Sequence, residues 1–239
     1  MIRLRSLLFY LGMTAGLLVV LPLLLPLLLF PYSIRYRVLT QWGRFTLWWL
    51  AQTCNLHFQV SGQENIPKGA AIVLAKHQSA WETIAMQTIF PPQTWVLKRS
   101  LFYIPIFGWG LYLLKAIGID RSAGRQALRQ IVEQGTERLK AGTWVVIFPE
   151  GTRTAPGERR KYNVGGALLA HKSGYPVVPV AHNAGHYWPR NSLLKHPGTI
   201  QLAIGPTIDP AGKKTEEINA QAEHWIETTQ ARLSTPTAP

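Results

Sequence analysis

The chain has 239 residues, of which 47% are hydrophobic and 15% are charged, and 25 Lys and Arg against 12 Asp and Glu give a formal charge of +13. The length is sufficient for one sizeable core, but charge is sparse for a soluble domain, where about a quarter of residues carry it. A basic surface can bind nucleic acid or anionic lipid. No nucleic-acid recognition motif is found, which favours lipid and excludes nucleic acid as a partner. The single cysteine, Cys54, excludes an intramolecular disulfide.

The N-terminal segment is predicted to enter a membrane. No charged residue lies between Arg5 and Arg35, and residues 7–30 are dominated by Leu and Val. About 20 apolar residues span a bilayer, so this run is long enough for a transmembrane helix. Pro22 and Pro26 would kink or break such a helix, so a segment that enters and leaves the same leaflet is an alternative. A cleaved signal peptide is disfavoured because no small-residue cleavage site follows the run.

Residues 38–54 have a different character. Aromatic side chains recur there at helical spacing with polar residues between them: Trp42, Phe45, Trp48 and Trp49. This pattern predicts an amphipathic helix lying in the membrane interface, with an ordinary core-packed helix as the alternative. We therefore expect residues 1–55 to form a membrane-anchoring helical region and residues 56–239 to form a catalytic domain.

From residue 56 onward, short apolar runs alternate with helical patterns. The patterns predict strands at 57–60, 70–75, 94–97, 115–119, 143–148, 177–181 and 199–204. Helices are predicted at 82–89, 101–114, 125–140, 164–172 and 215–233. Such alternation predicts an α/β domain with a mostly parallel central sheet flanked by helices, preceded by the hydrophobic anchoring segment.

Four of the predicted strands end, on the C-terminal side, in charged or titratable residues. These endings are Lys76-His77, Lys98-Arg99, Asp120-Arg121 and the segment 149–153. In open α/β sheets, ligands bind at the carboxyl ends of the strands. The four endings together therefore predict one convergent site.

His77 and Glu82 are separated by a strand-to-helix turn, and they can form an oriented base. The carboxylate would hold one ring nitrogen and leave the other to take a proton from a hydroxyl. Ser79 and Glu82 also form an S-x-x-E capping box, which would occupy the same carboxylate with the helix N-terminus. The spacing leaves both interpretations open.

The segment 148–153 places a glycine and an arginine directly after a buried strand. Gly151 lets the backbone approach a ligand closely, and Arg153 can hold a phosphate with forked hydrogen bonds. Lys98 and Arg121 would add positive charge from neighbouring strand ends. Solvated surface charge is the alternative for each cation taken singly.

Two other kinds of site are disfavoured by the sequence. His182 and His186 are spaced like metal ligands on a helix, but the surrounding residues favour a loop and no third ligand is evident. No G-x-S-x-G elbow is present, so a serine hydrolase is unsupported. We expect neither a metal nor a cofactor.

Four segments resemble, in order, the sequence blocks of the glycerolipid acyltransferases, particularly the bacterial lysophosphatidic acid acyltransferases. They are residues 77–82, 118–121, 148–153 and 178–180. The resemblance implies that His77 is the catalytic base, with Glu82 where the family usually has aspartate. It also implies a phosphate-binding group consisting of Lys98, Arg121, Glu150, Gly151, Thr152 and Arg153. Ser100 stands where the family has glutamate, and residues 178–180 would shape the acyl pocket.

The resemblance implies transfer of a fatty acyl group from acyl-CoA or acyl-ACP to the sn-2 hydroxyl of lysophosphatidic acid, giving phosphatidic acid in phospholipid biosynthesis. The expected partners are membrane phospholipid, lysophosphatidic acid and the thioester donor. The expected location is the inner membrane with the site on the cytoplasmic face, where thioester donors are made. Alternatives are another acceptor, such as a lyso-ornithine lipid or glycerol 3-phosphate, and a catalytically dead membrane lipid-binding scaffold.

Overall fold

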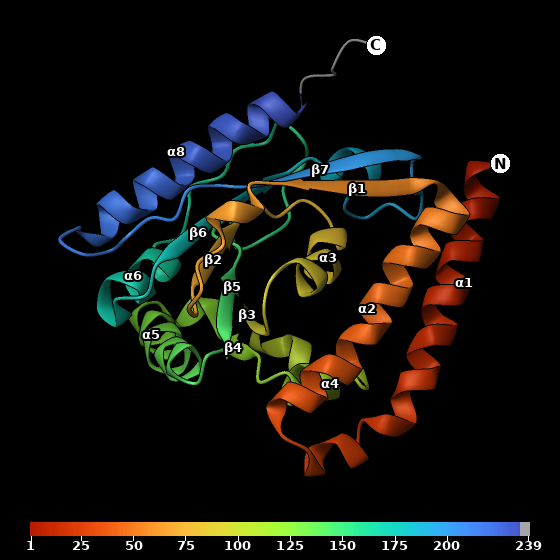
Figure 1. The fold of residues 1–239 in the computed structure, drawn as a ribbon, viewed down its shortest axis with the longest axis horizontal. Coiled ribbons are helices and arrows are strands. Elements are labelled where there is room, and N and C mark those ends of the chain that lie inside the picture. The colour runs from red at the N-terminus through yellow and green to blue at the C-terminus, as the bar shows by residue number, and fades with distance from the viewer. Residues whose placement is uncertain (235–239) are drawn as a thin grey trace.

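A seven-stranded sheet forms the centre of the protein (Figure 1), seen in a computed structural model that describes residues 1–234. The strands are β1 (Leu56–Ser61), β2 (Ile72–Ala75), β3 (Gln93–Lys98), β4 (Ile117–Ile119), β5 (Trp144–Ile147), β6 (Val177–His182) and β7 (Gly198–Ile204). Their order is β1-β7-β6-β2-β5-β3-β4. Neighbouring strands are parallel except β6 and β7, which are antiparallel. The predicted mostly parallel sheet is confirmed.

Helices cover both faces of this sheet (Figure 1). They are α1 (Ile2–Val20), α2 (Tyr32–Cys54), α3 (Trp81–Ile89), α4 (Phe107–Leu113), α5 (Arg125–Lys140), α6 (Gly165–Ser173), α7 (Ala184–Tyr187) and α8 (Thr215–Ser234). Within β2, Ile72 and Leu74 join the core beneath α5, α6 and α8, whereas Val73 and Ala75 join the core with α2 and α3. Because both faces of the sheet are covered, β2 is apolar at every position and does not alternate between apolar and polar residues.

Short 3-10 helices connect several of these elements: η1 (Leu21–Leu23), η2 (Pro26–Leu29), η3 (Gln63–Asn65), η4 (Arg99–Tyr103) and η5 (Arg121–Ala123). The helix predicted at 101–114 is divided into η4 and α4. Pro105 lies at the division, and the next residue, Ile106, has a positive φ of 68°. Proline cannot donate a backbone hydrogen bond, so it interrupts a continuous helix there.

The first two helices form a hairpin. The predicted break is confirmed, because α1 ends at Val20 and the prolines Pro22 and Pro26 lie in η1 and η2. The chain then reverses, and α2 runs back beside α1, so that the N-terminus and the start of β1 lie at the same end of the molecule (Figure 1). A second helix begins at Tyr32, earlier than the predicted start at residue 38.

Helix α2 packs closely on α1 and on the α/β domain. The indole nitrogens of Trp42 and Trp49 donate to backbone carbonyls of α1, at 3.0 and 3.1 Å. An added Cβ at Gly12 or Gly16 would overlap aromatic rings of α2. The inner face of α2 belongs to the same core as the sheet, while Trp48 remains exposed. Most of the aromatic pattern therefore reflects helix packing.

Candidate active site

The parallel strands β2, β5, β3 and β4 are neighbours, so their carboxyl ends meet at one edge of the sheet. A cavity of about 950 Å³ opens there. Most of the side chains predicted for the site line it: His77, Lys98, Arg121, Gly151, Thr152 and Arg153. Glu82 and Glu150 are buried behind its wall.

His77 is held by Glu82, as one of the two interpretations of the spacing requires. The Nδ1 atom of His77 lies 2.8 Å from Oε1 of Glu82. No partner for the other ring nitrogen, Nε2, is found among residues 1–234, and the side chain is 16% exposed. The arrangement leaves Nε2 free to exchange a proton with a molecule in the cavity.

The same carboxylate oxygen also binds the backbone of the turn that leads into helix α3. Oε1 of Glu82 accepts hydrogen bonds from the backbone N–H of Gln78 at 3.0 Å and of Ser79 at 2.9 Å. The Ser79 hydroxyl accepts from the N–H of Trp81 at 3.1 Å. One carboxylate oxygen therefore serves both the histidine and the turn that leads into α3. The capping box is only half formed, because the Ser79 hydroxyl accepts from Trp81 and not from Glu82.

Glu82 is fully buried, and burial alone would raise the pKa of its carboxyl. The neighbouring His182 and the hydrogen bond from His77 outweigh that effect and hold the pKa below its ordinary value. The carboxylate is therefore ionised at neutral pH and can stabilise a positive charge on His77.

The segment after β5 fixes the backbone of His77. The backbone N–H and the hydroxyl of Thr154 donate to the carbonyl of His77 at 2.7 and 3.1 Å. The phenyl ring of Phe148 stacks on the imidazole, with ring centroids 4.0 Å apart and planes inclined by 15°. Sequence reasoning missed both roles, because only the spatial pairing of β2 with β5 brings these side chains to His77.

Glu150 lies away from the cavity. Its carboxylate is 3.4 Å from the ammonium of Lys76 and accepts from the N–H of His77 at 3.4 Å. Burial raises the pKa of Glu150, an effect that Lys76 opposes. The geometry gives Glu150 a supporting role beneath the turn that carries His77, unlike the phosphate contact implied by the resemblance.

A buried ionic network extends this support to the C-terminal helix. Lys76 is fully buried, and its ammonium lies 2.7 Å from Oε1 of Glu227 on α8. The Tyr162 hydroxyl donates to the same oxygen at 2.8 Å. The sequence indicated Lys76 as a charged residue at the end of a strand, but nothing in the sequence of α8 singled out Glu227.

Several cations line one end of the cavity. Lys98, Arg121 and Arg153 are joined by Arg190, which sequence reasoning missed. The guanidinium of Arg121 donates to the carbonyl of Gly151, and that of Arg190 donates to the carbonyl of Arg153. These bonds hold the cationic side chains against the loop that follows β5. The resulting end of the cavity is suited to an anion such as a phosphate.

Gly151 adopts a left-handed backbone with φ of 70°. A Cβ at this position would lie 3.2 Å from Nδ2 of Asn163. Both the conformation and the close approach favour glycine here.

The remainder of the cavity is apolar and lies between the hairpin and the α/β domain. The hairpin contributes Met13, Leu17, Leu21 and Leu24, and the opposite side includes Ile106 and Leu111. An amphiphilic ligand with one charged end and one hydrocarbon chain would match this division.

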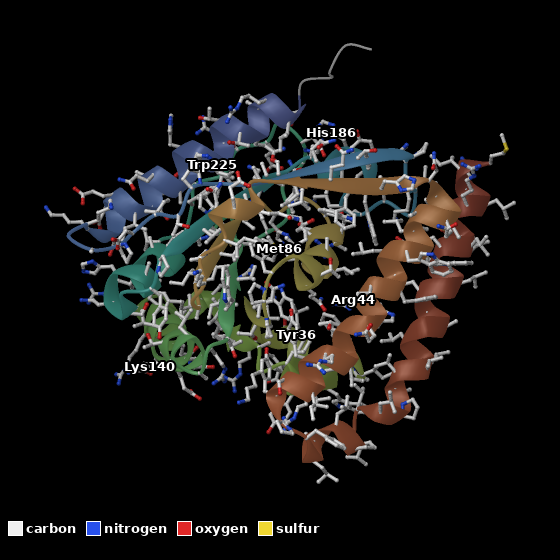
Figure 2. The ribbon with its side chains drawn as sticks, viewed as in Figure 1. Tyr36, Arg44, Met86, Lys140, His186 and Trp225 are labelled. Carbon is white, nitrogen blue, oxygen red and sulfur yellow. The ribbon has the colours of Figure 1, made fainter. Side chains whose placement is uncertain are left out.

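The histidines spaced like metal ligands diverge in the structure. His182 is completely buried beside Glu82, whereas His186 is exposed near the outer end of the sheet (Figure 2).

Comparison with known proteins agrees with this geometry. The family model described as Acyltransferase matches residues 57–183. The chain belongs to the acyltransferase family. This acyltransferase is 46% identical to the 1-acyl-sn-glycerol-3-phosphate acyltransferase of Pseudomonas aeruginosa over 237 residues, covering 96% of this chain and 91% of that protein. It is 32% identical to the enzyme of the same name from Saccharomyces cerevisiae over 145 residues, covering 55% of this chain and 48% of that protein.

A solved structure extends the similarity to the whole acyltransferase. The 1-acyl-sn-glycerophosphate (LPA) acyltransferase PlsC from Thermotoga maritima matches with a TM-score of 0.81 and 26% sequence identity. The match covers 99% of this chain and 97% of that one, so it includes the N-terminal hairpin. The resemblance stated from the sequence is therefore confirmed.

Proposed function

We propose that this acyltransferase moves a fatty acyl group from acyl-CoA or acyl-ACP to the sn-2 hydroxyl of lysophosphatidic acid, giving phosphatidic acid for phospholipid biosynthesis. The proposal rests on the position of an oriented base, His77, between the cationic and the apolar parts of the cavity. Nε2 of His77 is free in a cavity that is cationic at one end and apolar in the remainder. The names of the relatives, which specify the same acceptor class, support it.

In this mechanism, Nε2 of His77 removes the proton from the acceptor hydroxyl as that oxygen attacks the thioester carbonyl. Ionised Glu82 stabilises the imidazolium through Nδ1. When the tetrahedral intermediate collapses, the C–S bond breaks and the leaving thiolate takes the proton back from His77. A thioester is already activated, so neither a metal nor a covalent acyl-enzyme is required. General-base catalysis of this kind contributes about 10²- to 10⁴-fold in rate.

The acceptor phosphate would bind at the cationic end of the cavity. Lys98, Arg121 and Arg153 line it, and a guanidinium can hold a phosphate through paired hydrogen bonds. Gly151 and Thr152 would let the backbone approach the same phosphate. In this assignment, Glu150 keeps His77 in place through its backbone N–H and does not contact the substrate.

The hairpin would place the site at a membrane surface. The stretch Ile2–Leu23 is long and apolar enough to cross a membrane, and only 11% of its most apolar window is buried within the protein. Because α2 returns beside α1 (Figure 1), the hairpin would enter and leave one leaflet. Thioester donors are made in the cytosol, so the site would face the cytoplasmic side of the inner membrane.

An acyl-transfer assay on purified enzyme in phospholipid nanodiscs tests the proposal. Labelled acyl-CoA and acyl-ACP are each offered with lysophosphatidic acid, glycerol 3-phosphate or a lyso-ornithine lipid. The variant His77→Ala should lose about 10²- to 10⁴-fold in rate. The exposed His186 provides a matched control, and His186→Ala should retain full activity.

Near-full activity of His77→Ala would refute the mechanism. A preference for glycerol 3-phosphate or the lyso-ornithine lipid would keep the mechanism and change the acceptor. Failure to release thiol with any acceptor would establish the lipid-binding scaffold instead. Glu82 stands where the family usually has aspartate, but this difference gives the scaffold alternative no structural support, because the longer side chain reaches His77 at 2.8 Å.

A further inference from the structure

An exposed apolar surface lies outside the hairpin, on η4 and α4. Tyr103, Trp109 and Tyr112 are 74%, 57% and 68% exposed, and Ile104 and Phe107 are also exposed. We call these five residues the α4 surface. A group of exposed apolar side chains of this kind typically indicates a surface that binds a membrane or another molecule.

The α4 surface continues the apolar surface of the hairpin. In Figure 1, α4 lies beside the end of α2 that adjoins the hairpin turn. The ammonium of Lys115, just after α4, lies 5.5 Å above the ring of Tyr32, the first residue of α2. In the turn itself, Leu25 and Leu29 are highly exposed.

The composition of this segment suits an anionic bilayer. Residues 99–119 contain no Asp or Glu, and their charged residues are Arg99 and Lys115, one on each side of the α4 surface. Tyr and Trp favour the headgroup level of a membrane, and flanking cations are attracted to anionic lipid. A surface for a second protein chain would have no need of this charge pattern.

We propose that the α4 surface inserts into the same leaflet as the hairpin and forms the opposite side of a lateral opening to the cavity. Phe107 and Ile106 line the cavity on this side, and Leu21 and Leu24 line it on the hairpin side. The acyl chain of a membrane-bound acceptor then enters between two inserted elements without crossing water. This inference rests on the proposed membrane acceptor and on the hairpin as anchor.

Site-directed spin labelling tests the insertion directly. Cys54 is the single cysteine and is buried, so Cys54→Ala provides a background without reactive thiols. Single cysteines are introduced as Trp109→Cys and Tyr112→Cys on the α4 surface, Leu25→Cys in the hairpin turn and Lys140→Cys on α5. Lys140 is exposed on the side of the molecule away from the hairpin (Figure 2).

In anionic nanodiscs, labels at positions 109 and 112 should be relaxed more by oxygen than by a water-soluble nickel chelate. The label at position 25 should behave in the same way, and the label at position 140 should be relaxed more by the chelate. Accessibility to the chelate equal to that at Lys140 would overturn the proposal, while the Leu25 label and the acyl-transfer assay would still report on the anchor and the reaction. Protection from both reagents would indicate a second protein chain and would also overturn it.

A second readout needs no label. Neither Trp109 nor Tyr112 lines the cavity, so Trp109→Asp should leave turnover of a detergent-dispersed acceptor unchanged. In anionic nanodiscs it should raise KM for lysophosphatidic acid by about tenfold, since charge in the membrane is costly. Equal KM values in nanodiscs for Trp109→Asp and wild type would contradict the insertion.

His182, at the carboxyl end of β6, lies next to the pair formed by His77 and Glu82. It is fully buried behind Glu82, and its Nε2 lies 3.9 Å from Oε2 of Glu82. Oε2 has no hydrogen-bond partner within the described part of the chain. Nδ1 of His182 accepts from the N–H of Ala184 at 3.3 Å, so Nε2 carries the hydrogen and donates to the carbonyl of Lys76 at 2.9 Å.

We infer that His182 is a positioning residue for the His77–Glu82 pair. Its Nε2–H donates to the carbonyl of Lys76, and the same nitrogen lies 3.9 Å from Oε2 of Glu82, where the positive end of the N–H dipole favours the ionised carboxylate. The titratable groups facing His182 are Glu82, His77 and Lys76, and the ring of Trp81 closes the remaining side. Burial lowers the pKa of His182, which keeps it neutral and so preserves the tautomer.

A double-mutant cycle with Glu82→Gln separates this role from a purely structural one. His182→Phe should lower kcat by on the order of tenfold to a hundredfold with little change in KM and should shift the acid limb of the pH–rate profile. His182→Gln retains an amide donor and should keep most activity. In the Glu82→Gln background, His182→Phe should cost little more, because its effect passes through the carboxylate.

Additive losses in the cycle, or an unchanged pH profile for His182→Phe, would overturn the inference. If His182→Phe does not fold, as judged by thermal unfolding, His182→Leu takes its place in the same cycle.

Discussion

The replacement Glu82→Gln isolates the charge of the carboxylate from its shape. The side chain keeps its length, and its amide oxygen can still accept the N–H groups of Gln78 and Ser79. The hydrogen bonds to the turn that leads into α3 are therefore retained. The negative charge at 2.8 Å from Nδ1 of His77 is lost.

The size of the effect follows from what that charge does in the transition state. A hydrogen bond between charged groups is worth roughly 1.5–3 kcal/mol, against about 1 kcal/mol between neutral groups. Two unit charges about 4 Å apart interact by roughly 4 kcal/mol at the effective dielectric constant of a partly buried site. A loss of about 2–4 kcal/mol corresponds to a fall in kcat of roughly 30- to 1,000-fold.

The measurement is kcat for acyl transfer to lysophosphatidic acid in nanodiscs, with thermal unfolding as a check that the variant folds. Glu133→Gln provides a matched control, because Glu133 is an exposed carboxylate in a surface pair with Arg129. The control should be indistinguishable from wild type. If Glu82→Gln kept kcat within about threefold of wild type while folded, the ionised carboxylate would have no catalytic part, and the reasoning would be wrong.

Three further outcomes are expected. Gly151→Ala and Gly157→Ala should each lower stability by about 1–2 kcal/mol, because both positions have a positive φ. Gly151→Ala should also reduce activity strongly, whereas Gly157→Ala, with open space around its Cβ, should stay active. Lys76→Met leaves the buried carboxylate of Glu150 without its cation and leaves Glu227 only the more distant Arg159, and it should lower the free energy of unfolding by about 3–5 kcal/mol in thermal or denaturant unfolding. Burial lowers the pKa of His182, so its imidazole binds a proton more readily in the unfolded chain than in the folded one. The free energy of unfolding should therefore decrease as pH falls below about 6.5. The melting temperature of wild type should therefore fall further than that of His182→Gln between about pH 7.5 and pH 5.5, and equal decreases would contradict the assignment.

Most of the fold could be predicted from the sequence because its signals are local. Apolar runs such as 70–75 require a strand covered on both faces, and the amphipathic pattern at 125–140 corresponds to α5. The prolines at 22 and 26 predicted the break in the N-terminal helix. The pattern of residues 38–54 was less decisive, since a Trp-rich helix face fits a membrane interface or a neighbouring helix equally well.

The site was predictable where function and strand ends coincide. His77, Lys98 and Arg121 each follow a predicted strand, and the sheet order brings those ends together. Residues whose role depends on distant pairing were missed. Arg190 comes from a loop after α7, and Glu227 comes from a helix with ordinary polar character. No spacing rule connects such positions to residue 77.

The hairpin and the sheet share one hydrophobic core, and this has a practical consequence for shortened versions of the protein. Phe9 of α1 and Leu47 and Leu50 of α2 are buried in the same cluster as Val73 of β2. Lys195, from the loop before β7, binds the Tyr10 hydroxyl at 2.8 Å. Removing residues 1–55 to obtain a water-soluble catalytic fragment would uncover that core and open one wall of the cavity. Solubility is better sought by exchanging outward-facing leucines of α1, such as Leu4 and Leu11, which leaves the packed side of the hairpin intact.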